Sequence, residues 1–297
     1  MSRKLVYEHV DVFTKKAFGG NQLAVFTAPG RLAKSQMQLI AREIGFSETT
    51  YVFPSRAEGV DAKVRIFTPA KEIPFAGHPT LGTAFVIASR RKGRRKGPEK
   101  VVMELGVGKI DVDIKYSGRK INRITMHQPV PRFGSALQNR GQAARALGMK
   151  IFDVIGGGVV SNGVDFLIVE SQHVESVKKA RLNLEEAFSV ILRHKVIGIY
   201  LFARIEDRRI NIHSRCFAPT MGVPEDPATG SAAGALGGYL ARILKFPPEL
   251  HLVIEQGVEM GRLSLIGVDV CCERGMVHSV SVSGQVVKVG EGTIFLN

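Results

Sequence analysis

Short apolar stretches, many of them alternating with polar residues, recur along the chain and predict a strand-rich fold. The strand candidates of the first part include LVYEHVDVF at 5–13, TTYVF at 49–53 and VRIFT at 64–68. Helical spacing is rarer. One segment, 35–44, places four apolar residues on a single face, and Gly45 stands where it would end that helix. The pattern predicts a mixed α+β protein in which strands predominate.

Two segments of the chain repeat the same ordered set of residues. Residues 68–84 read TPAKEIPFAGHPTLGTA, and residues 218–232 read APTMGVPEDPATGSA. Both contain paired prolines, then His78-Pro79 or Asp226-Pro227, and then a Gly-Thr-Ala or Gly-Ser-Ala triplet. Each segment follows a strand-like run and leads into an apolar stretch of small residues that is typical of a buried helix. The repeat therefore predicts two halves with one shared architecture.

The order of the flanking elements repeats as well. Further strand candidates follow each repeated segment, and the second half opens with a helix predicted from Ser135 to Leu147. Strands are then expected near Val159, from Asp165 and from Arg209. We expect two domains, residues 1–128 and residues 129–284, with 285–297 available to complete the first.

Each repeated segment carries a signal for the start of a helix. Proline is favoured at the first helical position, so Pro79 and Pro227 predict helices that begin there, directly after His78 and Asp226. The free N–H groups and the dipole of such a start can hold an anion, and two related starts could hold one small carboxylate between them. Simple capping by Asp226 and simple packing of His78 are the alternatives.

Glu48 lies where the first predicted helix gives way to a strand, in FSETTYVF at 46–53. A buried carboxylate at such a junction can act as a general acid or base, whereas an exposed turn glutamate is the simpler interpretation. Aligning SNGVDF at 161–166 with this segment places Asn162 opposite Glu48. Only the first half would then supply a carboxylate.

The chain is basic, with 41 Lys and Arg against 27 Asp and Glu and a net charge of +14. The run RRKGRRK at 90–96 carries six of the positive charges. Such a run can bind nucleic acid or an anionic surface, or it can form a solvated loop after a helix. No aromatic residue interleaves it for base stacking, so we favour the loop and expect no nucleic-acid partner.

Cysteine usage and hydropathy indicate the cellular compartment and argue against disulfides, metals and membrane helices. Cys216, Cys271 and Cys272 are too few, and odd in number, for a disulfide framework, and none forms a CxxC pair that would indicate metal or dithiol chemistry. His213 and Cys216 share one strand-like run, but no second ligand pair accompanies them, so we expect no metal. No apolar stretch reaches the roughly 18 residues of a membrane helix, and the N-terminus does not resemble a signal peptide. We expect a cytoplasmic protein without a cofactor.

Six segments spread over the chain resemble the motifs of one known family. They are VDVFT at 10–14, FGGNQLAVF at 18–26, FSETTYVF at 46–53, FTPAKEIPFAGHPTLGTA at 67–84, VPEDPATGSAAGALGGYL at 223–240 and EQGVEMGR at 255–262. They resemble the PhzF-like phenazine-biosynthesis proteins, which are relatives of diaminopimelate epimerase. The resemblance covers nearly the whole chain.

The resemblance implies a fold of two pseudo-symmetric diaminopimelate epimerase-like domains, each a strand-rich barrel around a central helix. It also implies an active site between the halves and a homodimer. The epimerase relatives carry catalytic cysteines at the two helix starts, where this chain has His78 and Asp226. Cysteine-based racemisation is therefore not expected.

By the same resemblance, the protein is a cofactor-independent isomerase that shifts a proton on a small carboxylate-bearing substrate, similar to trans-2,3-dihydro-3-hydroxyanthranilate isomerase. Glu48 would be the acid and base, and His78 and Asp226 would position the substrate or tune its charge. The substrate-binding residues would be Asn21, Gly77, Gly230 and Ser231. Two alternatives stay open: an amino-acid racemase or epimerase of the same fold, and a non-catalytic binding protein that uses residues 90–96.

Overall fold

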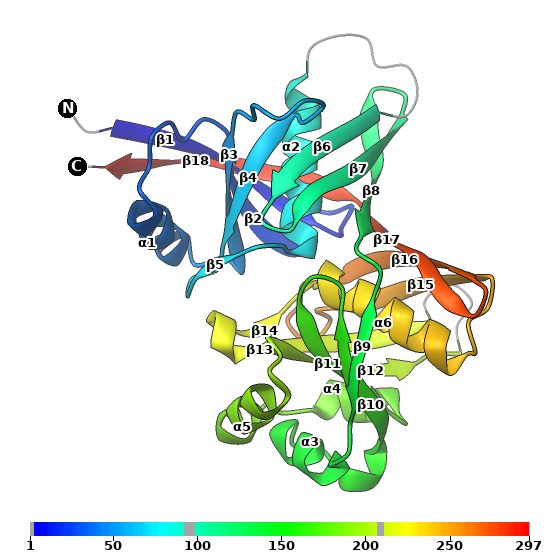
Figure 1. The fold of residues 1–297 in the computed structure, drawn as a ribbon. Coiled ribbons are helices and arrows are strands. Elements are labelled where there is room, and N and C mark those ends of the chain that lie inside the picture. Colours follow the sequence, from blue (N-terminus) through cyan, green and yellow to red (C-terminus); the bar gives the residue numbers. More distant parts are fainter. Residues whose placement is uncertain (1–2, 92–98, 207–210, 297) are drawn as a thin grey trace. The chain divides into compact units, whose positions relative to one another are not determined.

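The computed structural model describes residues 3–91, 99–206 and 211–296 (Figure 1). The chain divides into two compact units, one formed by residues 1–127 with 283–297 and the other by residues 128–282. The C-terminal strand belongs to the first unit because β18 (Val286–Leu296) pairs antiparallel with β1 (Arg3–Val12) over its whole length. No helix in the described ranges is long and apolar enough to cross a membrane.

Eight strands of the first unit follow one another in the hydrogen-bonded order β18-β1-β2-β3-β4-β6-β7-β8. Neighbours are antiparallel except for the parallel pairs β2–β3 and β4–β6. Parallel neighbours need a crossover connection, and α1 and α2 lie in these two connections. The short strand β5 pairs with β4. The bounds are β2 (Asn21–Phe26), α1 (Lys34–Ile44), β3 (Glu48–Phe53), β4 (Ala62–Phe67), β5 (Glu72–Ile73), α2 (Gly77–Arg90), β6 (Glu99–Leu105), β7 (Gly108–Ser117) and β8 (Lys120–Gln128).

The helix α2 is the centre of the first unit. Ten of its 14 residues are buried, and it packs against β1, β2, β3, β6, β7 and β18 (Figure 1). Close approach needs small residues: a Cβ at Gly82 would lie 2.6 Å from Leu23 Cδ2 and 2.9 Å from Val12 Cγ2. Leu23 and Val12 can therefore approach α2 this closely only because Gly82 has no side chain.

The second unit repeats this topology. Its strands follow the order β9-β10-β11-β12-β13-β15-β16-β17, with β11–β12 and β13–β15 parallel and β14 attached to β13. Each strand thus has a counterpart in the first unit, with β9 in the place of β18. The predicted architecture of two related strand-rich halves is confirmed. The strand bounds are β9 (Arg132–Ala136), β10 (Val154–Ser161), β11 (Asp165–Ser171), β12 (Gly198–Arg204), β13 (Ile212–Ala218), β14 (Val223–Asp226), β15 (Glu249–Gln256), β16 (Ser264–Glu273) and β17 (Met276–Gly284).

The helix α6 (Gly230–Ile243) is the centre of the second unit, with 11 of its 14 residues buried. It packs against β10, β11, β15 and β16. A Cβ at Gly237 would lie 2.7 Å from Val268 Cγ1 and 2.9 Å from Val270 Cγ2. Glycine weakens an isolated helix, but here the missing side chains allow the surrounding strands to pack closely against α6.

The other helices cover the outer faces of the strands. Met37, Ile40 and Ala41 of α1 are buried against a cluster that includes Tyr51 and Phe67, as the periodicity at 35–44 predicts. Gly45 ends α1 with φ 70° and confirms its predicted role. In the second unit, the outer core is formed by α3 (Arg140–Ala146), α4 (Val174–Lys179) and α5 (Leu184–His194) together with the neighbouring strands.

The helix predicted from Ser135 to Leu147 is shorter than expected. Residues 132–136 pair with β10 as strand β9, and α3 begins only at Arg140. Asn139 starts this helix, because its side chain accepts a hydrogen bond from the backbone N–H of Gln142 at 2.9 Å. Of the strand predicted from Arg209, the structure describes β13 from Ile212 on, and Arg209 itself lies outside the described residues.

Candidate active site

Glu48 is the first residue of β3, three residues after the left-handed glycine that ends α1. Its backbone is fixed by the parallel pairing of β3 with β2, in which Glu48 lies opposite Leu23. Its side chain is 14% exposed. The sequence placed Glu48 at a junction between helix and strand, and the structure shows a carboxylate that is mostly shielded from water but still reachable.

His78 lies between this carboxylate and Asn21. The Nε2 atom of His78 lies 3.4 Å from Oε2 of Glu48, and the Nδ1 atom of His78 lies 3.1 Å from Nδ2 of Asn21. His78 and Asn21 are both buried. The direction of the contact between Nδ1 and Asn21 depends on which ring nitrogen carries the proton. Three of the predicted site residues are thus brought together.

The imidazole of His78 is neutral at physiological pH. Burial lowers the pKa of His78 to about 3, and a hydrogen bond with the backbone of Gln22 only partly opposes this effect. A neutral ring beside Glu48 does not form an ion pair with the carboxylate. His78 can therefore orient the Glu48 side chain without stabilising its negative charge through an ion pair.

The start of α2 supplies hydrogen-bond donors near the same residues. The helix begins at Gly77, and His78 is its second residue. The first N–H groups of a helix have no partner within the helix, and they favour an anion. Proline at position 79 has no N–H group, so the donors of this turn come from Gly77 and His78. The prediction that Pro79 is the first helical residue is wrong by two positions.

Asp226 belongs to a separate polar cluster in the second unit. It ends β14, and its Oδ2 accepts a hydrogen bond from Thr229 Oγ1 at 2.5 Å. Gln256 fixes the corner: its Nε2 donates to the Asp226 carbonyl at 2.7 Å, and its Oε1 accepts from the Thr229 N–H at 3.1 Å. The prediction that α6 begins at Pro227 is therefore wrong, because these bonds keep residues 227–229 out of the helix.

Gly230 and Ser231 are the first two residues of α6. Gln128 Nε2 donates to the Gly230 carbonyl at 3.0 Å, and Asn162 Nδ2 donates to the Ser231 carbonyl at 2.8 Å. These bonds use only carbonyl groups. The N–H groups of the first turn are not used by these bonds, and such N–H groups at the start of a helix favour an anionic ligand.

The predicted equivalence of Asn162 and Glu48 is wrong. Asn162 lies between β10 and β11, whereas Glu48 begins β3. In strand pairing, Glu48 lies opposite Leu23, and the matching position at the start of β12 is Gly198, opposite Phe166. The alignment of residues 161–166 with residues 46–53 rested on similar residue types and matched the loop between β10 and β11 to the start of β3. The expectation that one half alone supplies a carboxylate at this position nevertheless agrees with Gly198.

Three residues that shape the site were missed by sequence reasoning: Gln128, Thr229 and Gln256. Gln256 lies within the EQGVEMGR motif and Gln128 at the predicted seam between the halves, so both positions were marked. A single amide, however, has no spacing pattern that reveals its partners. Only the fold shows that these amides hold the start of α6.

Other predicted features lie apart from these clusters. The cysteines are free, and none lies at the start of α2 or α6. In the described ranges, no group of three or more His, Cys, Asp or Glu side chains is arranged to hold a metal. Of the basic run, Arg90 pairs with Glu8, and Arg91 pairs with Asp61 and Glu99. Residues 92–96 lie outside the described residues.

Comparison with known proteins identifies the family. A family model described as phenazine biosynthesis-like protein matches residues 10–292. The chain belongs to this family. The predicted resemblance is thereby confirmed, and the motifs that carried it lie within the matched residues.

Relatives and solved structures agree with this assignment. The trans-2,3-dihydro-3-hydroxyanthranilate isomerase of Pseudomonas fluorescens is 34% identical over 292 residues, which cover 98% of this chain and 99% of that protein. A phenazine biosynthesis protein of the PhzF family from Bacillus anthracis has a TM-score of 0.85 at 26% identity, with coverage of 98% and 99%. A hydroxyproline epimerase from Agrobacterium vitis, 11% identical with a TM-score of 0.68, shares the fold over 99% of this chain and 92% of that one. The predicted fold and the predicted isomerase class are confirmed.

Proposed function

We propose that the protein is an isomerase in which Glu48 moves a proton between two carbon atoms of a small unsaturated carboxylate. The observation that carries the proposal is the cluster of Glu48, neutral His78 and Asn21 at the start of α2. A shielded carboxylate that keeps some exposure can exchange a proton with a bound molecule. The relative from Pseudomonas fluorescens, named for an isomerisation of trans-2,3-dihydro-3-hydroxyanthranilate, indicates the class of substrate.

The proposed step conserves all atoms and electrons of the substrate. The Glu48 carboxylate takes a proton from a carbon beside a carbon–carbon double bond, and the electron pair of that C–H bond shifts the double bond by one position. The protonated Glu48 then returns a proton to the far end of the shifted system. The carboxylate is restored, and no oxidant or co-reactant is consumed.

The other predicted residues have supporting roles in this proposal. His78 and Asn21 hold the Glu48 side chain in one orientation, and the N–H groups at the start of α2, including that of Gly77, bind the carboxylate of the substrate. Gly230 and Ser231 offer the corresponding N–H groups at the start of α6. Asp226 would contact a positively charged or hydroxyl group. The expectation that both helix starts bind one substrate stays a prediction, as do the homodimer, which light scattering would check, and the cytoplasmic setting, which fractionation would check.

The test is direct conversion by the purified protein. It is incubated with trans-2,3-dihydro-3-hydroxyanthranilate and, separately, with a panel of unsaturated carboxylates and single-enantiomer amino acids, and the products are followed by NMR. We expect a shifted double bond in at least one unsaturated carboxylate, with no loss of mass. Inversion of an amino acid without any double-bond shift would contradict the proposal and favour a racemase, and a panel left unchanged throughout would also contradict it.

A further inference from the structure

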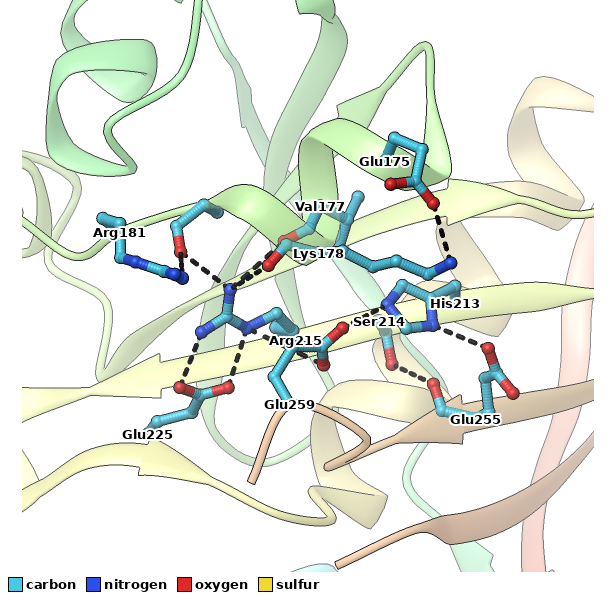
Figure 2. A network of polar contacts seen from close by, with 11 residues as sticks. Glu175, Val177, Lys178, Arg181, His213, Ser214, Arg215, Glu225, Glu255 and Glu259 are labelled. Atoms are coloured by element: carbon cyan, nitrogen blue, oxygen red, sulfur yellow. Dashed lines mark hydrogen bonds and ion pairs between the residues drawn. The ribbon is translucent and has the colours of Figure 1, made fainter. Parts of the chain in front are cut away.

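A buried histidine of the second unit lies between two carboxylates (Figure 2). His213, in β13, is fully buried. Its Nδ1 lies 2.7 Å from Oε1 of Glu255, and its Nε2 lies 2.9 Å from Oε1 of Glu259. An ionised carboxylate can only accept a hydrogen bond, so both ring nitrogens must donate. The geometry is that of an imidazolium with a carboxylate on each side.

The nearby basic side chains, Arg215 and Lys178, are each paired with a glutamate (Figure 2). Arg215 binds Glu225 through two hydrogen bonds of 2.8 Å each, and its Nε lies 4.0 Å from Oε2 of Glu259. On α4, Lys178 pairs with Glu175 at 2.8 Å. Burial by itself would lower the pKa of His213, but the hydrogen bonds with Glu259 and Glu255 outweigh it, and the pKa is raised.

The two carboxylates belong to different parts of the fold. Glu255 lies in β15, directly opposite His213 in the parallel pairing of β13 with β15. Glu259 lies in the turn 257–262, which closes on itself through the bond from the Arg262 N–H to the Gly257 carbonyl at 2.9 Å. The bond from His213 to Glu259 therefore fastens this turn to β13.

The turn 257–262 in turn supports the corner 226–229 at the start of α6. Gly257 has φ 75°, and a Cβ there would lie only 2.6 Å from the Pro227 carbonyl oxygen. Ser264 Oγ lies 2.9 Å from that same oxygen and 3.0 Å from the Arg262 carbonyl oxygen. Gln256, the residue before the turn, holds Asp226 and Thr229 directly. The turn 257–262 thus packs directly against the corner 226–229, and Ser264 joins the two by hydrogen bonds.

We propose that His213 is a positioning residue: as an imidazolium held by Glu255 and Glu259, it fastens the turn 257–262 to β13 and thereby fixes the corner 226–229 that begins α6. Its effect on turnover rests on the proposed function, whereas its effect on the corner does not. The fastening is complete while His213 is charged. Because the pKa of His213 is raised in the folded protein, this contribution is fully present below about pH 6.5 and is lost as the pH rises through the folded value.

Hydrogen exchange tests the fastening independently of any substrate. The variants are His213→Gln and Glu259→Gln, the second of which keeps the size of the side chain and serves if the first does not fold. His251→Gln is the matched control: His251 also lies near two carboxylates, at 2.7 Å from Asp269 and 3.4 Å from Glu249, but it is exposed. At pH 6, we expect protection of residues 226–231 and 257–262 to fall at least about tenfold in Glu259→Gln, with no change in His251→Gln.

The pH dependence and the kinetics complete the test. The difference in protection between wild type and His213→Gln should shrink as the pH rises from 6 to 9. With an active substrate, kcat/KM of the Glu259→Gln variant should fall about 10- to 100-fold, while His251→Gln keeps the wild-type value. Unchanged protection at 257–262, or loss there with full protection at 226–231, would overturn the inference. If wild type converts no substrate, the proposed function fails, and exchange still decides this inference.

Discussion

Replacing Glu48 by Gln is expected to lower kcat by about 10²- to 10⁴-fold, the contribution that a placed acid–base group typically makes. Gln keeps the size of the side chain and one oxygen that can accept a hydrogen bond, but it cannot take a proton from carbon. The neighbours His78 and Asn21 remain in place, so KM should change much less than kcat. Steady-state kinetics on the substrate found by the NMR panel measures both quantities.

The matched control for this variant is Glu43→Gln. Glu43 lies in α1, five residues before Glu48, and its side chain is exposed. We expect wild-type kinetics from this variant. If Glu48→Gln retained more than about a tenth of the wild-type kcat, the assignment of Glu48 as the acid and base would be wrong.

Replacing His78 by Gln is expected to remove a large acid-dependent loss of stability. In the unfolded chain His78 titrates near its ordinary pKa of 6.5, whereas burial lowers the pKa in the folded protein to about 3. Between these values the unfolded state binds a proton that the folded state excludes, so folding stability falls as the pH falls. The expected loss from this one group is about 1.4 kcal/mol for each pH unit below 6.5.

Urea unfolding at pH 7, 6, 5 and 4.5 measures this effect. The free energy of unfolding of wild type minus that of His78→Gln should decrease steadily across this series. The control is His278→Gln, since His278 is an exposed residue of β17, and here the difference should stay nearly constant. A constant difference for His78→Gln as well would show that folding does not lower the pKa of His78, and the neutral ring proposed beside Glu48 would then be untenable.

The sequence predicted the architecture well because the repeat is written in local patterns. The paired motifs at 68–84 and 218–232 mark the same connection in both units, and the small residues that follow them mark the two central helices. The face at 35–44 and the glycine after it were predictable for the same reason. Each of these signals depends on residues that are neighbours along the chain or one helical turn apart.

The errors arose where distant residues decide the local structure. Asp226-Pro227 looks like the start of a helix, but Gln256, far along the chain, holds the Asp226 carbonyl and the Thr229 N–H, and the helix begins at Gly230. Asn162 was matched to Glu48 from similar letters, while strand pairing matches Glu48 to Gly198. Such long-range hydrogen bonds and strand registers carry no spacing signal in a single sequence.

The candidate site shows the same division. Glu48, His78 and Asn21 were named from motifs, and the structure adds their distances and the neutral state of His78. The roles of the Gln128 and Gln256 amides and of His213 between Glu255 and Glu259 were not predictable, since each side chain acts through partners on other elements.

The most direct measurement of the central claim is the uptake of solvent hydrogen at carbon. Wild type and Glu48→Gln are incubated with the active substrate in deuterium oxide, and the position of deuterium in the product is read by NMR. The account predicts deuterium at the one carbon that gains a proton, delivered by wild type and nearly absent with the variant over the same time. Product that Glu48→Gln forms or labels at the wild-type rate would contradict proton transfer through Glu48.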